Sequence, residues 1–230
     1  MDWKSDEAFG RWRALIEQIG VAVYLQKFSL DAGRAFSVWE EGAPPAIVIN
    51  KTDRGQNAWT FSLIHEYAHL LIRKPGLSDR NPKNPVEAFC NRFAAAFLMP
   101  IEALRLLLPV WPDKPINWDV NSVWNAAKRL KVSGQALAIR LEELNKAPQG
   151  FNQLFVVKTP TTTSKKDQKI DFVVVRLSEL GGYYTSSVIG ALDREVIDIV
   201  HASQALGFGP NSMEKARKYV GRQHELASVG

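Results

Sequence analysis

The stretch "FSLIHEYAHLLI" (61–72) places two histidines four residues apart, with a glutamate directly after the first. On an α-helix, residues four apart share one face, so His65 and His69 can direct two imidazoles at one metal ion. Zinc accepts neutral imidazole nitrogen, and its catalytic sites combine three protein ligands with a water molecule. Glu66 lies about 100° around the helix axis from His65 and about 60° from His69, so its carboxylate can reach that water without binding the metal. This is the HExxH pattern, in which the glutamate is the general base for hydrolysis of a polarised carbonyl.

The alternative is an amphipathic helix whose two histidines are surface or capped core residues. The surrounding sequence favours the metal site, because the motif lies within a strongly apolar helix that follows a β-rich segment. Zinc is the expected ion, since two imidazoles favour it over metals that prefer hard oxygen ligands, and Mn²⁺ stays open as a second choice.

A third ligand must come from another part of the chain, and "NPVEAFCNRFAAAFLMP" (84–100) is the best source. On a helix, Glu87, Cys90 and Asn91 share one face, and the small residues 94–96 would let this helix pack closely against the first. Glu87 could then reach the metal, while Asn91, one turn later, could hold a metal ligand in place through a hydrogen bond.

Spacing alone leaves the role of Glu87 open. Asn84 as N-cap and Pro85 at the first helical position put Glu87 where a capping-box carboxylate belongs, so cap and metal ligand are equally compatible with the sequence. Cys90 is a rival ligand, although a lone cysteine among phenylalanines is more often a small buried hydrophobe. Asp79, in a loop, is a weaker candidate.

The elements that must position these residues can be read from periodicity and from turn residues. A helix over 7–19 precedes three β-rich runs, which are followed by the two site helices; Asp53 or Asn57 could cap the first of these. The predicted strands cover 21–28, 34–40 and 46–50, and the predicted site helices cover 58–73 and 85–99. A third helical region spans 118–145. Beyond it we expect two strands around a polar loop at 159–169, and then helices near 183–193, 195–206 and 212–221.

Composition narrows the class of protein. The 230 residues carry a net charge of only +5, spread evenly except for "SKKDQK" (164–169), whereas a dedicated nucleic-acid binder concentrates its basic residues. A single cysteine excludes a disulfide framework within the chain. The chain shows no signal peptide and no run approaching the ~18 apolar residues of a membrane span. We expect a soluble, cytoplasmic protein without a membrane partner.

Taken together, "FSLIHEYAHLLI" and "VEAFCNRFAAAFLMP" resemble the ImmA/IrrE family of bacterial metallopeptidases, which carry this pair of helices. The resemblance extends to the strands before the motif, including "AFSVWE", and covers about 9–145. "VWNAAKRLKVSGQALAIRLEEL" (123–144) is similar to the helix-turn-helix-like unit that follows the peptidase helices in this family. From residue 151 onward the resemblance is loose.

The resemblance implies an α+β fold with a small zincin-like domain over 1–115 (a short sheet, the HExxH helix and a second ligand helix) and a helix-turn-helix-like unit over 116–148 packed on it. The strands and helices expected beyond this unit make 151–230 a small α/β segment, for which we expect a substrate-docking or regulatory role. The implied site is gluzincin-like: His65, His69 and Glu87 bind zinc, and Glu66 is the catalytic base. Family members cut helix-turn-helix transcriptional repressors in the cytoplasm and so switch on stress-response or mobile-element genes, which implies a repressor as the protein substrate.

Two other functions compete with proteolysis. One is a non-proteolytic regulator that binds a repressor or toxin on a zincin scaffold. Glu66 argues against this function, because a purely structural metal site does not need a general base. The other is direct DNA binding through 123–144, which is disfavoured because the second helix there offers only Gln135 and Arg140 before two glutamates. For the electrophile that stabilises the oxyanion, the sequence offers His201, Tyr183, Tyr184 and Arg73 without choosing among them.

Overall fold

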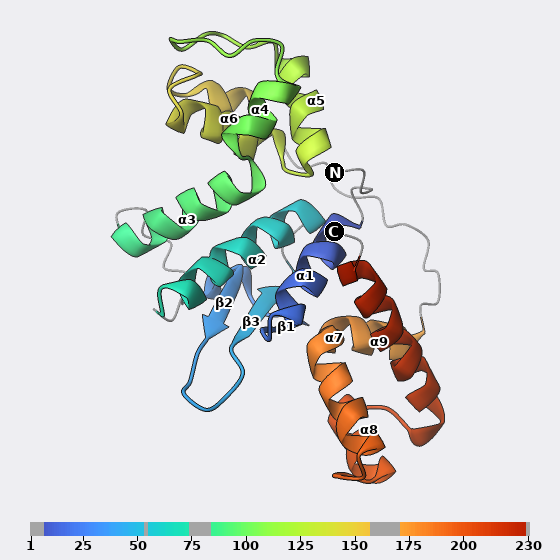
Figure 1. Cartoon of the computed structure of the whole chain (residues 1–230). Helices are drawn as coiled ribbons and strands as arrows, with labels where there is room; N and C mark the ends of the chain where they lie inside the picture. Colours follow the sequence, from blue (N-terminus) through green and yellow to red (C-terminus); the bar gives the residue numbers. More distant parts are fainter. Residues whose placement is uncertain (1–6, 53–54, 74–83, 157–170, 229–230) are drawn as a thin grey trace.

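The computed structural model describes residues 7–52, 55–73, 84–156 and 171–228 (Figure 1). The possible helix cap Asp53, the weaker ligand candidate Asp79 and the basic loop 164–169 lie outside these ranges. The architecture is mixed α+β, with a small sheet and helices around it, as the sequence predicted. None of the helices in the described part is both long and apolar enough to cross a bilayer.

The sheet has three strands in the order β1-β3-β2, and all three were predicted from the sequence. Their bounds are β1 (Ala22–Gln26), β2 (Ala35–Val38) and β3 (Ala46–Asn50). β1 runs parallel to the central β3, and β2 runs antiparallel to it, with a short 3₁₀ turn, η1 (Leu30–Ala32), before β2. Ile47 and Ile49 of β3 are fully buried, as the alternation of a half-covered strand requires. Because β3 is the central strand, β2 lies at one edge of the sheet and β1 at the other.

Two helices pack beside this sheet. α1 (Ala8–Gln18) and α2 (Gln56–Leu71) contact each other, and α2 also contacts β2 and β3. The residue before α2 is Gly55, whose φ of +90° suits a glycine, and its N-terminus has no side-chain cap. The expectation that Asn57 caps this helix was wrong, because the helix begins one residue earlier and Asn57 lies in its first turn.

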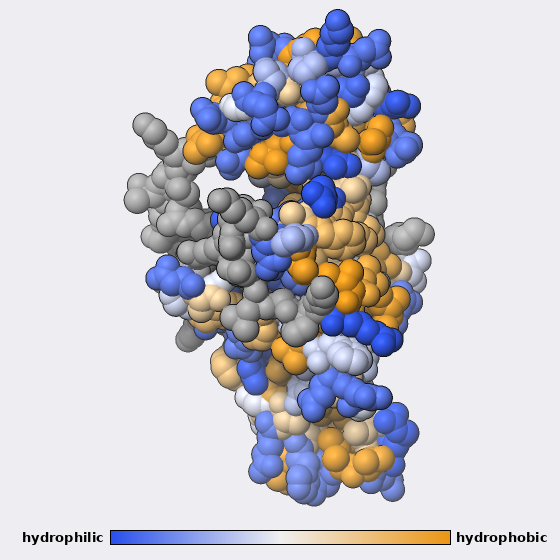
Figure 2. All heavy atoms as spheres, turned by 90° about the vertical axis from the view of Figure 1, so that its left-hand side faces the viewer, coloured by the Kyte–Doolittle hydropathy of each residue, from blue (hydrophilic) through white to orange (hydrophobic). Residues whose placement is uncertain are grey.

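α3 (Pro85–Leu98) packs against α2. Asn84 is its N-cap, with the side chain accepting a hydrogen bond from the Val86 amide at 3.0 Å. Its inner face buries Cys90, Ala94 and Ala95, and these small residues let the two helices approach closely. Its outer face carries exposed phenylalanines, and Figure 2, which views the molecule from this side, shows hydrophobic surface over the middle of the molecule. After Pro100 the chain enters a short helix, α4 (Ile101–Leu107), that the sequence analysis did not separate.

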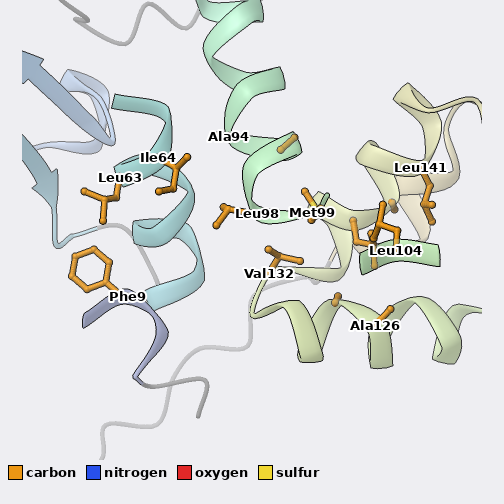
Figure 3. Close-up of a cluster of buried hydrophobic side chains, with 14 of the residues drawn as sticks. Phe9, Leu63, Ile64, Ala94, Leu98, Met99, Leu104, Ala126, Val132 and Leu141 are labelled. Atoms are coloured by element: carbon orange, nitrogen blue, oxygen red, sulfur yellow. The ribbon is translucent and has the colours of Figure 1, made fainter. Parts of the chain in front are cut away.

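The helix-turn-helix-like unit consists of two capped helices, α5 (Val120–Leu130) and α6 (Gly134–Glu143). The 3₁₀ segment η2 (Phe151–Phe155), at the start of the C-terminal part, packs against α6. One group of contacting buried side chains runs from Phe9 to Phe155, so this unit shares its core with the peptidase helices. Figure 3 shows the junction, where Leu98 lies between Ile64 of α2 and Val132 at the turn between α5 and α6, and Met99 lies on the side of Leu104.

The C-terminal part is helical, which corrects the α/β segment predicted for 151–230. The described residues there contain no strand; they form η2, α7 (Phe172–Asp193), α8 (Ile199–Leu206), η3 (Pro210–Ser212) and α9 (Met213–Ser228). The run 173–175, three β-branched valines, was expected to belong to the strand after the polar loop, but it lies in the first turn of a helix capped by Asp171, whose side chain accepts from the Val173 amide. α7, α8 and α9 enclose a second group of buried side chains.

α7 joins the rest of the molecule along β1, at the edge of the sheet away from β2. The buried Arg13 donates to the carbonyl of Ser178 at 2.6 Å and to that of Val23 on β1, and forms an ion pair with Glu17 at 3.3 Å. Glu17 in turn accepts from the Gly182 amide at 2.9 Å. α7 is kinked there at Gly181, which has a φ of +84°. Arg13 and Glu17 of α1 thus clamp the kink of α7 onto β1.

Candidate metal centre

Helix α2 brings the two histidines and the glutamate of the motif into the protein interior. Its apolar residues Leu63 and Ile64 are anchored in the core, which fixes the rotation of the helix. His65 and His69 are buried on one face, and their Nε2 atoms lie 3.2 Å apart. Glu66 is 0 % exposed. The helix geometry expected from the sequence is therefore present.

Glu87 reaches the same point from the first turn of α3. Its Oε2 atom lies 3.2 Å from His65 Nε2, and its Oε1 atom lies 3.2 Å from His69 Nε2. The N-terminal amide of Val86 is capped by Asn84, and the Glu87 carboxylate faces the imidazoles. Of the two roles that spacing left open, the structure places Glu87 where a third metal ligand would be.

The donor set fits a zinc ion. In the described residues, His65, His69 and Glu87 each offer one ligand atom, and these atoms lie within 4.8 Å of one another. Two donors, each about 2.0–2.1 Å from a tetrahedral ion, are about 3.3 Å apart, which is close to the spacing seen here. Two imidazole nitrogens at 3.2 Å, with a carboxylate facing both, need a shared proton or a cation between them. The three side chains therefore satisfy the size and chemistry of a His₂Glu site.

The protonation state of His65 also suits metal binding. Burial, and to a lesser extent the neighbouring His69, lower the pKa of His65 to about 4, although a hydrogen bond with the Asn91 side chain acts in the opposite direction. His65 is thus neutral near pH 7, which is the form that donates a lone pair to zinc. The role of Asn91 in holding a metal ligand stays a prediction.

Ser37 is a site residue that the sequence analysis missed. Its Oγ donates a hydrogen bond of 2.9 Å to Oε2 of Glu66, and both side chains are buried. Ser37 lies on the edge strand β2, directly beside α2. The alternation of buried and exposed residues along the strand could have indicated it. Ala35 and Ser37 share the buried face, so the polar side chain of Ser37 needs a hydrogen-bond partner in the interior.

Cys90 is not in the metal cluster. It is completely buried, and burial together with the carboxylates of Glu87 and Glu66 raises the pKa of its thiol to about 12. A thiol in that state is a poor ligand because zinc binds the thiolate. The structure agrees with the interpretation of Cys90 as a small buried hydrophobe.

The four candidates for the electrophile are not gathered at the cluster. His201 is exposed on α8 and contacts Asp198 at 2.8 Å. Tyr183 and Tyr184 belong to α7, and the hydroxyl of Tyr184 donates to the carbonyl of Ala205. Arg73 lies over the ring of Trp39, 5.4 Å from its centroid. Three of the four thus belong to the C-terminal helices that dock on β1.

A cavity of about 860 Å³ lies beside the cluster, between α2, α3 and α6. Two of its lining residues touch the site directly. Asn91 is hydrogen-bonded to His65, and the ring of Phe61 lies 6.4 Å from the His65 ring, centroid to centroid. The sequence gave no indication of this cavity, because it depends on how α6 docks against the peptidase helices.

Comparison with known proteins agrees with this geometry. Residues 16–142 match the family described as the IrrE N-terminal-like domain, a peptidase family, and this confirms the resemblance noted from the sequence. The match covers the sheet, both site helices and the helix-turn-helix-like unit. Neither the curated proteins nor the solved structures contain a match.

Proposed function

The chain belongs to the IrrE N-terminal-like peptidase family, and on that premise we propose that it is a zinc-dependent endopeptidase. The observation that carries this proposal is the buried convergence of His65, His69 and Glu87, with Glu66 beside them and held by Ser37. A purely structural metal site has no use for a second buried carboxylate that does not bind the ion.

In the proposed mechanism His65, His69 and Glu87 would hold the ion. A bound zinc ion supplies Lewis acidity, which polarises the scissile carbonyl and acidifies a water molecule. Glu66 acts as general base: its carboxylate accepts the proton of the attacking water as the new C–O bond forms. It then delivers that proton to the leaving amine as the C–N bond breaks. Ser37 keeps the Glu66 carboxylate in one orientation through the bond from its hydroxyl.

The substrate we propose is a specific protein, namely a helix-turn-helix transcriptional repressor, whose cleavage would derepress stress-response or mobile-element genes. The support is the family to which residues 16–142 belong. The cavity beside the cluster adds support, because it offers space for part of a peptide next to His65. We place the reaction in the cytoplasm, where such a repressor acts.

The test combines metal analysis with cleavage of a repressor encoded beside this gene. We expect about one zinc per wild-type chain, and cleavage of the repressor that is lost at least a thousandfold in Glu66→Gln while the zinc is retained. His69→Ala should lose both. Glu102→Gln, an exposed carboxylate change on α4, is the matched control and should behave as wild type.

Two outcomes would contradict the proposal. One is a wild-type protein without stoichiometric zinc. The other is a Glu66→Gln variant that cleaves as well as wild type. If Glu66→Gln instead inactivates the repressor by forming a stable complex, the protein is a non-proteolytic regulator on a zincin scaffold.

A further inference from the structure

We propose that the cavity between α2, α3 and α6 is the pocket for an apolar side chain of the peptide substrate, next to the bond that is cleaved. In this arrangement α6, the second helix of the helix-turn-helix-like unit, is a wall of the substrate cleft and determines specificity. The inference rests on the proposed peptidase function and adds a substrate class to it.

The position of the cavity is the first argument. Asn91 lines the cavity and is hydrogen-bonded to His65, and Phe61 lines it one helical turn before His65. His65, Glu66, His69 and Glu87 do not line the cavity themselves. Phe61 and Asn91 connect it to His65, so we place the peptide residue next to the scissile bond there. No side chain of α6 belongs to the metal cluster, yet six residues of the turn and helix line the cavity: Val132, Ser133, Gln135, Ala136, Ile139 and Glu143.

The lining chemistry selects the ligand. The apolar part of the wall comes from all three helices and the α5–α6 turn: Phe61, Ala95, Met99, Val132, Ala136 and Ile139. Carboxamide side chains of Gln56, Asn57 and Gln135 add paired donors and acceptors, which match the N–H and C=O groups of a peptide backbone.

The charge of the cavity lining argues against a phosphate or nucleic-acid ligand. One cation, Arg34, and one anion, Glu143, line the cavity, so its net charge is close to zero. A phosphate or nucleic-acid site would need a surplus of Arg and Lys. A largely apolar wall with a few amides suits a bulky, uncharged side chain on an extended chain.

The orientation of α6 points to the same conclusion. Gln135, one of two residues on this helix that could read a base edge, lines the cavity. The other, Arg140, is only 9 % exposed and lies 3.5 Å from Glu143 in an ion pair. The side chains that a recognition helix would present to DNA are thus turned toward the cavity and the core, so α6 serves peptide recognition.

The experiment profiles cleavage of a proteome-derived peptide library by mass spectrometry, using zinc-loaded full-length protein. Wild type should prefer a bulky apolar residue at one position next to the cut. Ala136→Phe fills the pocket and should reduce the preference for bulky over small residues about tenfold or more, whereas Ile139→Ala widens it and should favour larger rings. Leu106→Ala, which removes the same kind of side chain from the exposed face of α4, is the matched control and should leave the profile unchanged.

A second arm separates the pocket from the chemistry. Immobilised, zinc-loaded Glu66→Gln protein should enrich apolar peptides from the same library, and adding Ala136→Phe should abolish that enrichment. If the pocket variants retain zinc and cleave with the wild-type preference, the pocket inference is overturned while the peptidase stands. If no peptide or repressor is cut but the enrichment and its loss are seen, the pocket stands and the proposed reaction fails. Absence of both preference and enrichment also overturns the pocket.

Discussion

The hydroxyl of Ser37 lies against the buried carboxylate of Glu66. A buried carboxylate needs hydrogen-bond donors to offset the loss of hydration, and Ser37 supplies one at 2.9 Å. Because the donor is on a strand and the acceptor on a helix, the bond also fixes the direction in which the carboxylate faces. Ser37 is therefore a positioning residue for the proposed base.

We predict that Ser37→Ala lowers kcat about tenfold with little change in KM, which corresponds to ~1.4 kcal/mol of lost transition-state stabilisation. Ser37→Thr, which keeps the hydroxyl, should retain most of the activity. Steady-state kinetics on a peptide from the cleavage profile would measure both, with zinc content as the control. An unchanged kcat in Ser37→Ala would remove Ser37 from the mechanism.

A second prediction concerns Cys90. With a pKa of about 12, its thiol is ionised in roughly one molecule in ten thousand at pH 8, and it is completely buried. Native protein should therefore not react with thiol reagents between pH 7 and 9, whereas urea-unfolded protein should react rapidly. Cys90→Ala should keep its full complement of zinc. Loss of zinc in that variant would restore Cys90 as a ligand.

At the scale of elements, the sequence predicted the sheet and both site helices because their signals are local. Strands and amphipathic helices can be recognised from the spacing at which apolar residues recur, and the HExxH motif places three side chains on one helix. The role of Glu87 could not be decided in the same way. Capping and metal binding both call for a carboxylate at the third position of α3, and only the packing of α3 on α2 separates them.

The error at residues 172–177 has a different cause. "FVVVRL" has high β-propensity, but its buried residues Val173, Leu177 and Leu180 recur at helical spacing, and Val174 is 52 % exposed. Val173, Leu177 and Leu180 before the kink, and Val188 and Ile189 after it, pack with buried residues of α8 and α9, which outweighs the local preference for a strand. The partners of these residues are distant in sequence, so a short window could not reveal them.

Two glycines in helices offer a matched test of packing. A Cβ atom on Gly134, in α6, would lie 2.9 Å from the Phe155 ring and 3.0 Å from that of Trp124, whereas one on Gly221, in α9, would meet nothing within 4 Å. Gly134→Ala should therefore lower the free energy of unfolding by about 1–3 kcal/mol through overpacking. Gly221→Ala should raise it by up to about 1 kcal/mol, because alanine is the better helix former. Thermal unfolding of both variants measures the difference, and equal shifts would contradict the packing argument.

At the scale of the whole molecule, the C-terminal helices and the peptidase part meet at Gly181. An added Cβ there would lie 2.2 Å from Glu17 Oε1 and 2.6 Å from the carbonyl oxygen of Val23, and the φ of +84° disfavours any other residue. Gly181→Ala should cost more than about 3 kcal/mol and release α7 from β1. Gly190→Ala, in the same helix, meets only the flexible end of Arg194 and is the control. Limited proteolysis should cut the C-terminal helices of the first variant and spare the second.

Metal removal should destabilise the molecule as a whole, because the proposed ligands tie α2 to α3 in the middle of the first core. Zinc at a thousand times its Kd stabilises the native state by about 4 kcal/mol. For a chain of this size, chelation should then lower Tm by roughly 8–16 °C, and added zinc should restore it. His65→Ala should melt at the lower temperature with or without zinc. A wild-type Tm that does not respond to chelator would contradict the metal site.

The clamp of Arg13 and Glu17 on the kink of α7 also bears on self-association. A three-stranded sheet has two edge strands, each of which could hydrogen-bond with a strand of another molecule. Uncovered edge strands promote edge-to-edge aggregation. At β1 the outward carbonyl of Val23 is already taken by Arg13, and α7 lies along that strand. A neighbouring molecule cannot extend the sheet from this side unless the C-terminal helices leave first, so the clamp protects the fold against polymerisation through β1.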